Sequence, residues 1–198
     1  DGGYNRIIEY DPQTSEKKPL DIPGNESAYI FSASPWFDEI YIRRSSWTYA
    51  GKKQSWSSRT RKFKDLILEP PGIYDNPGGL VSRRVLVKSH DGVKVPLSII
   101  HGKDIKLNGQ SPTLISGYGA YGSSRGVGYS TTRLAWLEQD GVYAVAHVRG
   151  GGEFGKQWHL DGMMETKPNT WKDFIACSQF LIDEGYTSPE FLAGQGGS

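Results

Sequence analysis

Three glycine-rich stretches of the chain hold the residues that are able to carry chemistry. They are GYGAYG at 117–122, HVRGGGEFGKQWH at 147–159 and GGS at 196–198. The last is preceded by FLAGQ, an apolar strand pattern, which places Ser198 where the first half of a G-x-S-x-G nucleophile elbow would lie. Such a serine attacks a carbonyl in acyl transfer. The alternative interpretation is that GGS begins a flexible glycine-serine tail.

The stretch GYGAYG satisfies the pattern G-x-G-x-x-G, which is typical of dinucleotide-binding loops. Such a loop opens a helix, and an acidic residue about 20 positions later binds the ribose. Neither feature follows here, so we expect no nucleotide site. As an alternative, the hydroxyl of Tyr118 or Tyr121 is able to donate a hydrogen bond to a developing oxyanion. Otherwise both tyrosines pack as amphipathic surface residues.

The stretch HVRGGGEFGKQWH has three consecutive glycines, which predict close backbone packing or mobility at the edge of a sheet. His147 and His159, with Glu153, contain atoms that bind metals, but their spacing forms no compact ligand pattern. We therefore interpret both histidines as structural residues. The sequence predicts no metal and no cofactor.

From Pro112 onward, the pattern predicts strands alternating with helices. In order these are the strand PTLIS, the helix TRLAWLEQDG, the strand VYAVAHV, the helix TWKDFIACSQFLIDEG and the buried strand FLAGQ. This alternation indicates a mostly parallel sheet covered on both faces. A sheet that stopped after its central strand would have an uncovered edge. We therefore expect that further residues, of this chain or another, complete the sheet.

The second helix should have one apolar face and identifiable ends. The predicted face consists of Trp171, Phe174, Ile175, Leu181 and Ile182. Asn169 or Thr170 is suited to cap its start, and Gly185 is suited to end it.

Residues 1–75 predict short antiparallel strands separated by turns, because β-branched and aromatic residues alternate with Pro, Gly and Asp. Residues 83–101 predict a hairpin around HDG. The basic stretch 52–64 contains Trp56 and Phe63, which allows an RNA-binding interpretation, but a solvated strand pair is favoured.

The overall composition excludes several functions. With 23 basic and 22 acidic residues in 198, the charge is nearly balanced, so we expect no nucleic-acid partner and no membrane surface. No apolar run approaches the roughly 20 residues of a membrane span. Cys177 is the single cysteine, which excludes an intrachain disulfide and fits a reducing compartment. We expect a cytoplasmic location, or a periplasmic one if a leader was removed.

Taken together, GYGAYG, AVAHVRGGGEFGKQWH, LIDEGYTSPE and the terminal GGS resemble, in order and spacing, the prolyl oligopeptidase family of serine peptidases. The resemblance runs from about Arg83 to Ser198. It implies that residues 77–198 are the N-terminal part of an α/β-hydrolase peptidase domain. Residues 1–76 then resemble the C-terminal part of a seven-bladed β-propeller, which admits only short peptides to the active site.

The resemblance also implies a role for each matching residue. Ser198 matches the nucleophile, and Tyr118 matches the side chain that donates to the oxyanion. The second donor would be the backbone N–H after Ser198. In this fold the Asp and His of the triad follow the serine along the chain. The 198 residues alone are therefore expected to be inactive, and the remainder of the hydrolase domain is an expected partner.

Tyr121 matches a position in the pocket for the residue before the cut, where proline-specific relatives usually have phenylalanine. Relatives that cut after lysine or arginine often have tyrosine there. Cleavage after proline is the leading expectation, and cleavage after a basic residue is the first alternative. An esterase or acylaminoacyl-peptidase of the same fold is another alternative, as is a noncatalytic fragment.

Overall fold

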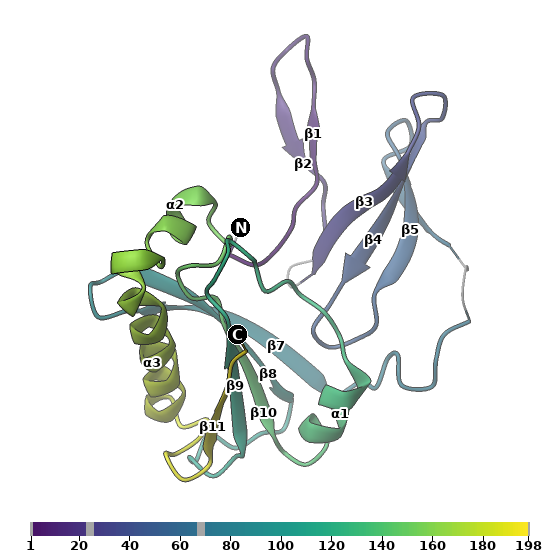
Figure 1. Cartoon of the computed structure of the whole chain (residues 1–198). Coiled ribbons are helices and arrows are strands. Elements are labelled where there is room, and N and C mark those ends of the chain that lie inside the picture. Colours follow the sequence, from purple (N-terminus) through teal and green to yellow (C-terminus); the bar gives the residue numbers. More distant parts are fainter. Residues whose placement is uncertain (1, 23–25, 67–69, 198) are drawn as a thin grey trace. The chain divides into compact units, whose positions relative to one another are not determined.

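The computed structural model describes residues 2–22, 26–66 and 70–197 (Figure 1). The chain divides into two compact units, which are described separately below. One, the strand-rich unit, consists of residues 4–77 and 126–129. The other, the mixed unit, consists of residues 1–3, 78–125 and 130–198.

The strand-rich unit consists of short antiparallel strands, as the sequence predicts. Its described residues form a hairpin of β1 (Ile8–Tyr10) with β2 (Lys17–Pro19), and a meander of β3 (Ser27–Ala33), β4 (Glu39–Ser45), β5 (Lys52–Ser57) and β6 (Lys62–Asp65). Each strand of the meander pairs with the next one in sequence. The basic stretch 52–64 forms β5, β6 and their turn, which confirms the strand-pair interpretation.

The core of the strand-rich unit forms where apolar side chains of β3, β4 and β5 meet the segment around β2. Its buried members are Ile7, Leu20, Ile22, Ala28, Ile42 and Trp56. Ile42 is completely buried and pairs with Ile30 of β3. Trp56 is buried next to Phe63 on β6, and the guanidinium carbon of Arg61 lies 5.5 Å from the centre of its ring system. The aromatic residues of the basic stretch therefore stabilise the fold.

The mixed unit is built on a five-stranded sheet in the order β11-β9-β10-β8-β7. Its strands are β7 (Leu80–Lys88), β8 (Lys94–Gly102), β9 (Thr113–Gly117), β10 (Val142–Ala146) and β11 (Leu192–Gln195). The hairpin β7–β8 and the strands after Pro112 confirm the sequence predictions. However, the sheet is mixed rather than mostly parallel. Only β9, β10 and β11 pair in parallel, because β8 is antiparallel to both of its neighbours.

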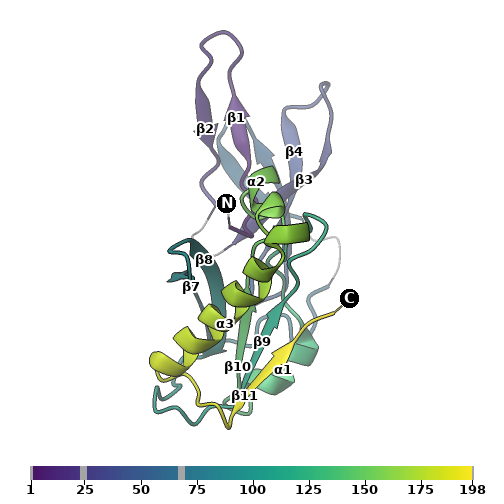
Figure 2. The same cartoon turned by 60° about the vertical axis from the view of Figure 1, so that its left-hand side comes forward.

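Helices cover both faces of this sheet. They are α1 (Thr131–Leu137), α2 (Lys156–Leu160), the short 3-10 helix η1 (Met164–Thr166) and α3 (Pro168–Asp183). Figures 1 and 2 show α1 and α3 on opposite faces of the sheet. Between them lies a core formed mainly by β8, β10 and α3, with Val95, Leu97, Ile99, Ile115, Val142, Ala144, Cys177 and Leu181 almost completely buried.

The predicted apolar face of α3 is wrong in part. The helix buries Thr170, Asp173, Cys177 and Leu181, whereas Trp171 is 51% exposed and Ile175 is 62% exposed. The physical reason is a buried ion pair of Asp173, described below, which turns the polar residue toward the sheet. Pro168 begins the helix without a side-chain cap, and Gly185, at φ +74°, follows its end as predicted.

Strand β11 also differs from its prediction as a buried strand. Only Leu192 is partly buried, and the other three residues of the strand are exposed. Among the described residues β11 pairs with β9 alone, so it forms the edge of the sheet. An edge strand has a neighbour on one side only, which explains its exposure.

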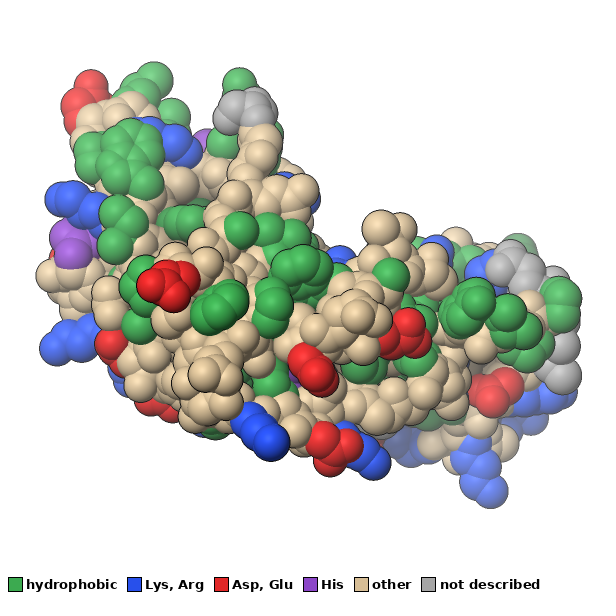
Figure 3. All heavy atoms as spheres, turned by 90° about the horizontal axis from the view of Figure 1, so that it is seen from below, with side chains coloured by type: hydrophobic (Ala, Val, Ile, Leu, Met, Phe, Trp, Pro, Cys, Tyr) green, Lys and Arg blue, Asp and Glu red, His purple; other side chains and the backbone are tan. Residues whose placement is uncertain are grey.

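The surface carries charges of both signs, in keeping with the composition. Acidic and basic side chains both occur on the face seen in Figure 3, with hydrophobic side chains between them. Within the described ranges, no helix is both long and apolar enough to cross a membrane.

Candidate active site

The three glycine-rich stretches meet at the carboxyl ends of the parallel strands of the mixed sheet. Tyr118 directly follows the end of β9, His147 follows the end of β10 and Gly196 follows the end of β11. Since these strands run in parallel, their carboxyl ends lie at the same edge, where α/β sheets bind their ligands. The sheet therefore brings together segments as far apart in the sequence as Tyr118 and Gly196.

Ser198, the predicted nucleophile, lies outside the described residues. The chain is described as far as Gly197, and both Gly196 and Gly197 are exposed. A Cβ added at Gly196 would lie 3.8 Å from the carbonyl oxygen of Gly117. The segment that leaves β11 thus passes beside the start of the loop that contains Tyr118.

Tyr118, the predicted oxyanion donor, is half-buried on the loop after β9. The guanidinium carbon of Arg125, at the far end of this loop, lies 5.3 Å from the centre of the Tyr118 ring. This distance is within the range of a cation–π interaction. Tyr118 is therefore neither free in solvent nor part of the core. This intermediate exposure is compatible with its predicted role as a hydrogen-bond donor to an oxyanion.

The backbone after Tyr118 is held in a conformation that only glycine adopts readily. Gly119 has φ +69°, and a Cβ there would lie 2.4 Å from Cγ2 of Thr170 and 2.7 Å from Cγ2 of Val148. The Nζ of Lys167 donates a hydrogen bond of 2.5 Å to the carbonyl oxygen of Gly119. Partial burial lowers the pKa of Lys167. Thr170 of α3 and Lys167, the residue before the helix, thus fix the position of Gly119 in the loop.

Tyr121, the predicted pocket residue, lies at the tip of the same loop. Its φ is +55°, a left-handed conformation that is uncommon for a residue with a side chain, and the residue is 83% exposed. The following Gly122 is also left-handed, at φ +61°. The role of Tyr121 in substrate binding stays a prediction.

The three glycines after β10 pack directly against the Tyr118 loop. Added Cβ atoms would lie 2.0 Å from the carbonyl oxygen of Gly119 for Gly150, and 2.2 Å from that of Gly122 for Gly152. The N–H of Gly122 donates to the carbonyl of Gly150 at 3.1 Å. These contacts confirm the prediction of close backbone packing, and no side chain fits between the two loops.

The two histidines of the triple-glycine stretch contact different residues. His147 is completely buried, with Nε2 3.0 Å from Oγ of Ser98 and Nδ1 3.6 Å from Oε1 of Glu153. His159 is half-buried, and its Nδ1 lies 2.9 Å from the carbonyl oxygen of Gly150. Across the described part of the chain, no group of three or more metal-binding side chains comes together.

Arg149 forms a buried ionic network that the sequence interpretation did not include. It is 3% exposed and donates from Nε and Nη2 to Asp173, at 2.9 and 2.7 Å, and from Nη1 to Asp91 at 2.6 Å. Ser89 adds a hydroxyl donor to Asp173 at 2.6 Å. The hydrogen bond to Asp173 raises the pKa of Arg149, and the one from Arg149 lowers the pKa of Asp91. The network joins the glycine loop, α3 and the β7–β8 turn.

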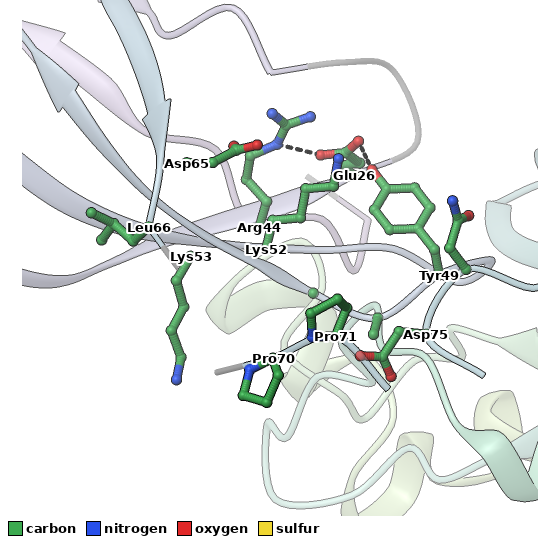
Figure 4. Close-up of a pocket in the computed structure, with 13 residues that line it drawn as sticks. Glu26, Arg44, Tyr49, Lys52, Lys53, Asp65, Leu66, Pro70, Pro71 and Asp75 are labelled. Carbon is green, nitrogen blue, oxygen red and sulfur yellow. Dashed lines mark hydrogen bonds and ion pairs between the residues drawn. The ribbon is translucent and has the colours of Figure 1, made fainter. Parts of the chain in front are cut away.

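A hollow among the described residues lies elsewhere, in the strand-rich unit (Figure 4). It measures about 610 Å³, and both acidic and basic side chains line it. Glu26 in its wall accepts hydrogen bonds from the Tyr49 hydroxyl and from Nε of Arg44, the latter at 2.5 Å. None of the predicted site residues borders this hollow.

Comparison with known proteins relates this arrangement to one family. A sequence profile described as the prolyl oligopeptidase family matches residues 128–198. The prolyl endopeptidase of Elizabethkingia miricola is 32% identical over 194 residues, which cover 98% of this chain and 27% of that protein.

Two solved structures extend the similarity to the fold. Oligopeptidase B from Leishmania major has a TM-score of 0.85 at 25% identity, over 98% of this chain and 29% of the other. Prolyl oligopeptidase B from Galerina marginata, bound to a 35mer hydrolysis and macrocyclization substrate, has a TM-score of 0.85 at 29% identity, over 96% of this chain and 27% of the other. The chain thus spans little more than a quarter of the length of these relatives.

Proposed function

This chain belongs to the prolyl oligopeptidase family, and from that premise we propose that it carries part of a serine peptidase that hydrolyses short peptides. The observation that carries the proposal is the meeting of three loops at one sheet edge: the Tyr118 loop, the triple-glycine loop and the segment leaving β11. A hydrolase of this kind requires a nucleophile and oxyanion donors at this edge.

In the proposed mechanism Ser198 attacks the peptide carbonyl. A histidine takes the hydroxyl proton and later delivers it to the leaving amine, while an aspartate orients that histidine. Both would follow Ser198 in the sequence, so only the serine of the triad lies in this chain. The Tyr118 hydroxyl donates to the oxyanion, together with the backbone N–H after Ser198.

The two parts of the chain have different proposed roles. Residues 1–76 form the C-terminal part of a β-propeller, a fold in which each blade is a four-stranded antiparallel sheet. The β3–β6 meander has this number and order of strands, which supports the proposal. Residues 77–198 form the first part of the α/β-hydrolase domain, with the remainder of that domain completing the sheet beyond β11.

Cleavage after proline is the proposed specificity, since the Elizabethkingia relative is a prolyl endopeptidase. Cleavage after lysine or arginine is the second candidate, favoured by the tyrosine at position 121 and by the similarity to an oligopeptidase B. The two candidates differ in the residue before the cleaved bond, which the substrate pocket must accept. Matched peptides with proline or arginine before the cleaved bond, compared by kcat/KM, distinguish them.

The deciding experiment uses the protein that contains this chain and a fluorophosphonate probe. We expect the label on Ser198 in peptide mapping, and we expect the Ser198→Ala variant to lose both labelling and peptidase activity. Labelling of another serine, or activity that survives in the variant, would contradict the proposal. The isolated 198 residues should be unlabelled and inactive, because they lack the proposed histidine and aspartate. A noncatalytic fragment would give no label in either form.

A further inference from the structure

Arg125 contacts residues of both glycine-rich loops at the site. Its side chain contacts Tyr118, and its backbone contacts Glu153 of the triple-glycine loop. Its guanidinium carbon lies 5.3 Å from the centre of the Tyr118 ring. Its backbone N–H donates a hydrogen bond of 2.9 Å to Oε1 of Glu153, the glutamate that follows the triple glycine. Arg125 is itself exposed, so it is not a core residue of the unit.

Glu153 is a fixed anchor for this contact. It is 6% exposed, and its carboxylate faces the buried His147 at 3.6 Å. Its backbone carbonyl accepts a hydrogen bond from Gly2 at 3.1 Å. The adjacent Gly151 and Gly152 leave no space for side chains, so the backbone that carries Glu153 has little freedom to move. The end of the Tyr118 loop is therefore tied to a rigid point.

The direction of the Tyr118 hydroxyl depends on what holds its ring. An oxyanion donor works when it lies about 2.7–3.1 Å from the position of the developing charge. The ring is half-buried, and rotation about its side-chain bonds moves the hydroxyl by more than this tolerance. A guanidinium on one face restricts that rotation.

We propose that Arg125 is a positioning residue that orients Tyr118 as oxyanion donor, and that Glu153 holds Arg125 in place. This inference rests on the proposed function. It also gives a role to the glutamate of the RGGGE sequence. Arg125 acts through Tyr118, so its contribution disappears when the tyrosine hydroxyl is absent.

The test is a double-mutant cycle with Arg125→Ala and Tyr118→Phe in the protein that contains this chain. Arg125→Ala should lower kcat by about two- to fivefold, the effect of losing one exposed cation–π contact, with KM unchanged. In the Tyr118→Phe background the same substitution should leave kcat unchanged. Arg83→Ala, at an exposed arginine on β7, is the matched control and should have no effect.

Two variants of the anchor complete the experiment. Glu153→Ala removes the acceptor of the Arg125 N–H, so kcat should fall as it does for Arg125→Ala, again only when Tyr118 is present. Glu153→Gln retains an amide oxygen at the same place and should restore most of the activity. Because Arg125 is exposed, its variants should fold even if Glu153→Ala does not.

Four results would overturn the inference. One is an Arg125→Ala variant with the wild-type kcat. Another is an equal loss of kcat in both backgrounds, which would show that Arg125 acts independently of Tyr118. An effect confined to substrates with a carboxylate beside the cleaved bond would show that Arg125 binds substrate directly. A Tyr118→Phe variant with full activity would overturn both this inference and the assignment of Tyr118 as oxyanion donor. If Ser198 of that variant is still labelled by the fluorophosphonate probe, the proposed peptidase function is unaffected.

Discussion

The buried pair of Arg149 and Asp173 provides the most direct test of the structure. The Asp173 carboxylate accepts four hydrogen bonds: three from Arg149, through its backbone N–H, Nε and Nη2, and one from the hydroxyl of Ser89. Asp173 is completely buried and Arg149 nearly so. In the Asp173→Ala variant, the guanidinium would remain buried with only the partly exposed Asp91 as its partner.

The expected loss follows from that geometry. Removing one partner of a buried ion pair costs about 3–5 kcal/mol, because an uncompensated charge stays in the interior. For a domain of this size, such a loss lowers the melting temperature by about 10 °C. Scanning calorimetry of the protein that contains this chain would measure it. Amide exchange in β10 would show whether the mixed unit is the part affected.

Two further variants make the result interpretable. Asp183→Ala removes an exposed carboxylate from the same helix, one that accepts a bond from Gln179 at 2.8 Å, and should cost less than about 0.5 kcal/mol. Arg149→Met combined with Asp173→Leu removes both charges and should restore most of the stability. The reasoning is refuted if Asp173→Ala behaves like the Asp183 control, or if the double variant is less stable than Asp173→Ala.

Three other predictions concern single residues. Gly119→Ala should destabilise the mixed unit by more than about 1 kcal/mol, because its left-handed backbone disfavours a side chain and Thr170 occupies the space of the Cβ. Gly102→Ala should leave the melting temperature unchanged, since no atom lies within 4 Å of the added Cβ. Arg149 lowers the pKa of Asp91. The stability gained from this pair is therefore complete above the ordinary carboxyl pKa and is lost as the pH falls through the lowered value. Between about pH 6 and pH 2, the melting temperature should fall less steeply for Asp91→Asn than for the wild type. Burial raises the pKa of the Cys177 thiol, so a thiol reagent should react with it only at the rate of unfolding, and rapid labelling of the native protein would contradict its burial.

The sequence alone predicted the succession of strands and helices along the chain after Pro112, and the position of the loops at the site. Apolar runs of strand length, separated by helical patterns, indicate parallel strands, and glycines directly after them indicate loops with close backbone contacts. The interlocking of Gly150 and Gly152 with the Tyr118 loop confirms this reasoning. The prediction succeeded because close backbone packing requires glycine, and a run of glycines can be recognised within a short stretch of sequence.

The face of α3 was harder to predict, because a partner distant in sequence determines it. Counting apolar side chains selects Trp171 and Ile175, but the helix turns Asp173 inward to meet Arg149, 24 residues earlier. The available signal was the spacing of Asp173, Cys177 and Leu181, at positions i, i+4 and i+8, which places a carboxylate on the same stripe as two buried residues. Arg149 itself had no local pattern that distinguished it from an exposed arginine.

The interlocked glycines also limit how such a site is able to diversify. Since the Tyr118 loop and the triple-glycine loop touch through backbone atoms, substitutions at Gly119, Gly150 or Gly152 would separate the loops rather than adjust them. Tolerance to mutation should instead concentrate at the outward-facing tip, where Tyr121 is 83% exposed. A randomised library aimed at new substrate preferences would therefore vary the tip and leave the glycines unchanged, so that selectivity evolves on a backbone that stays constant.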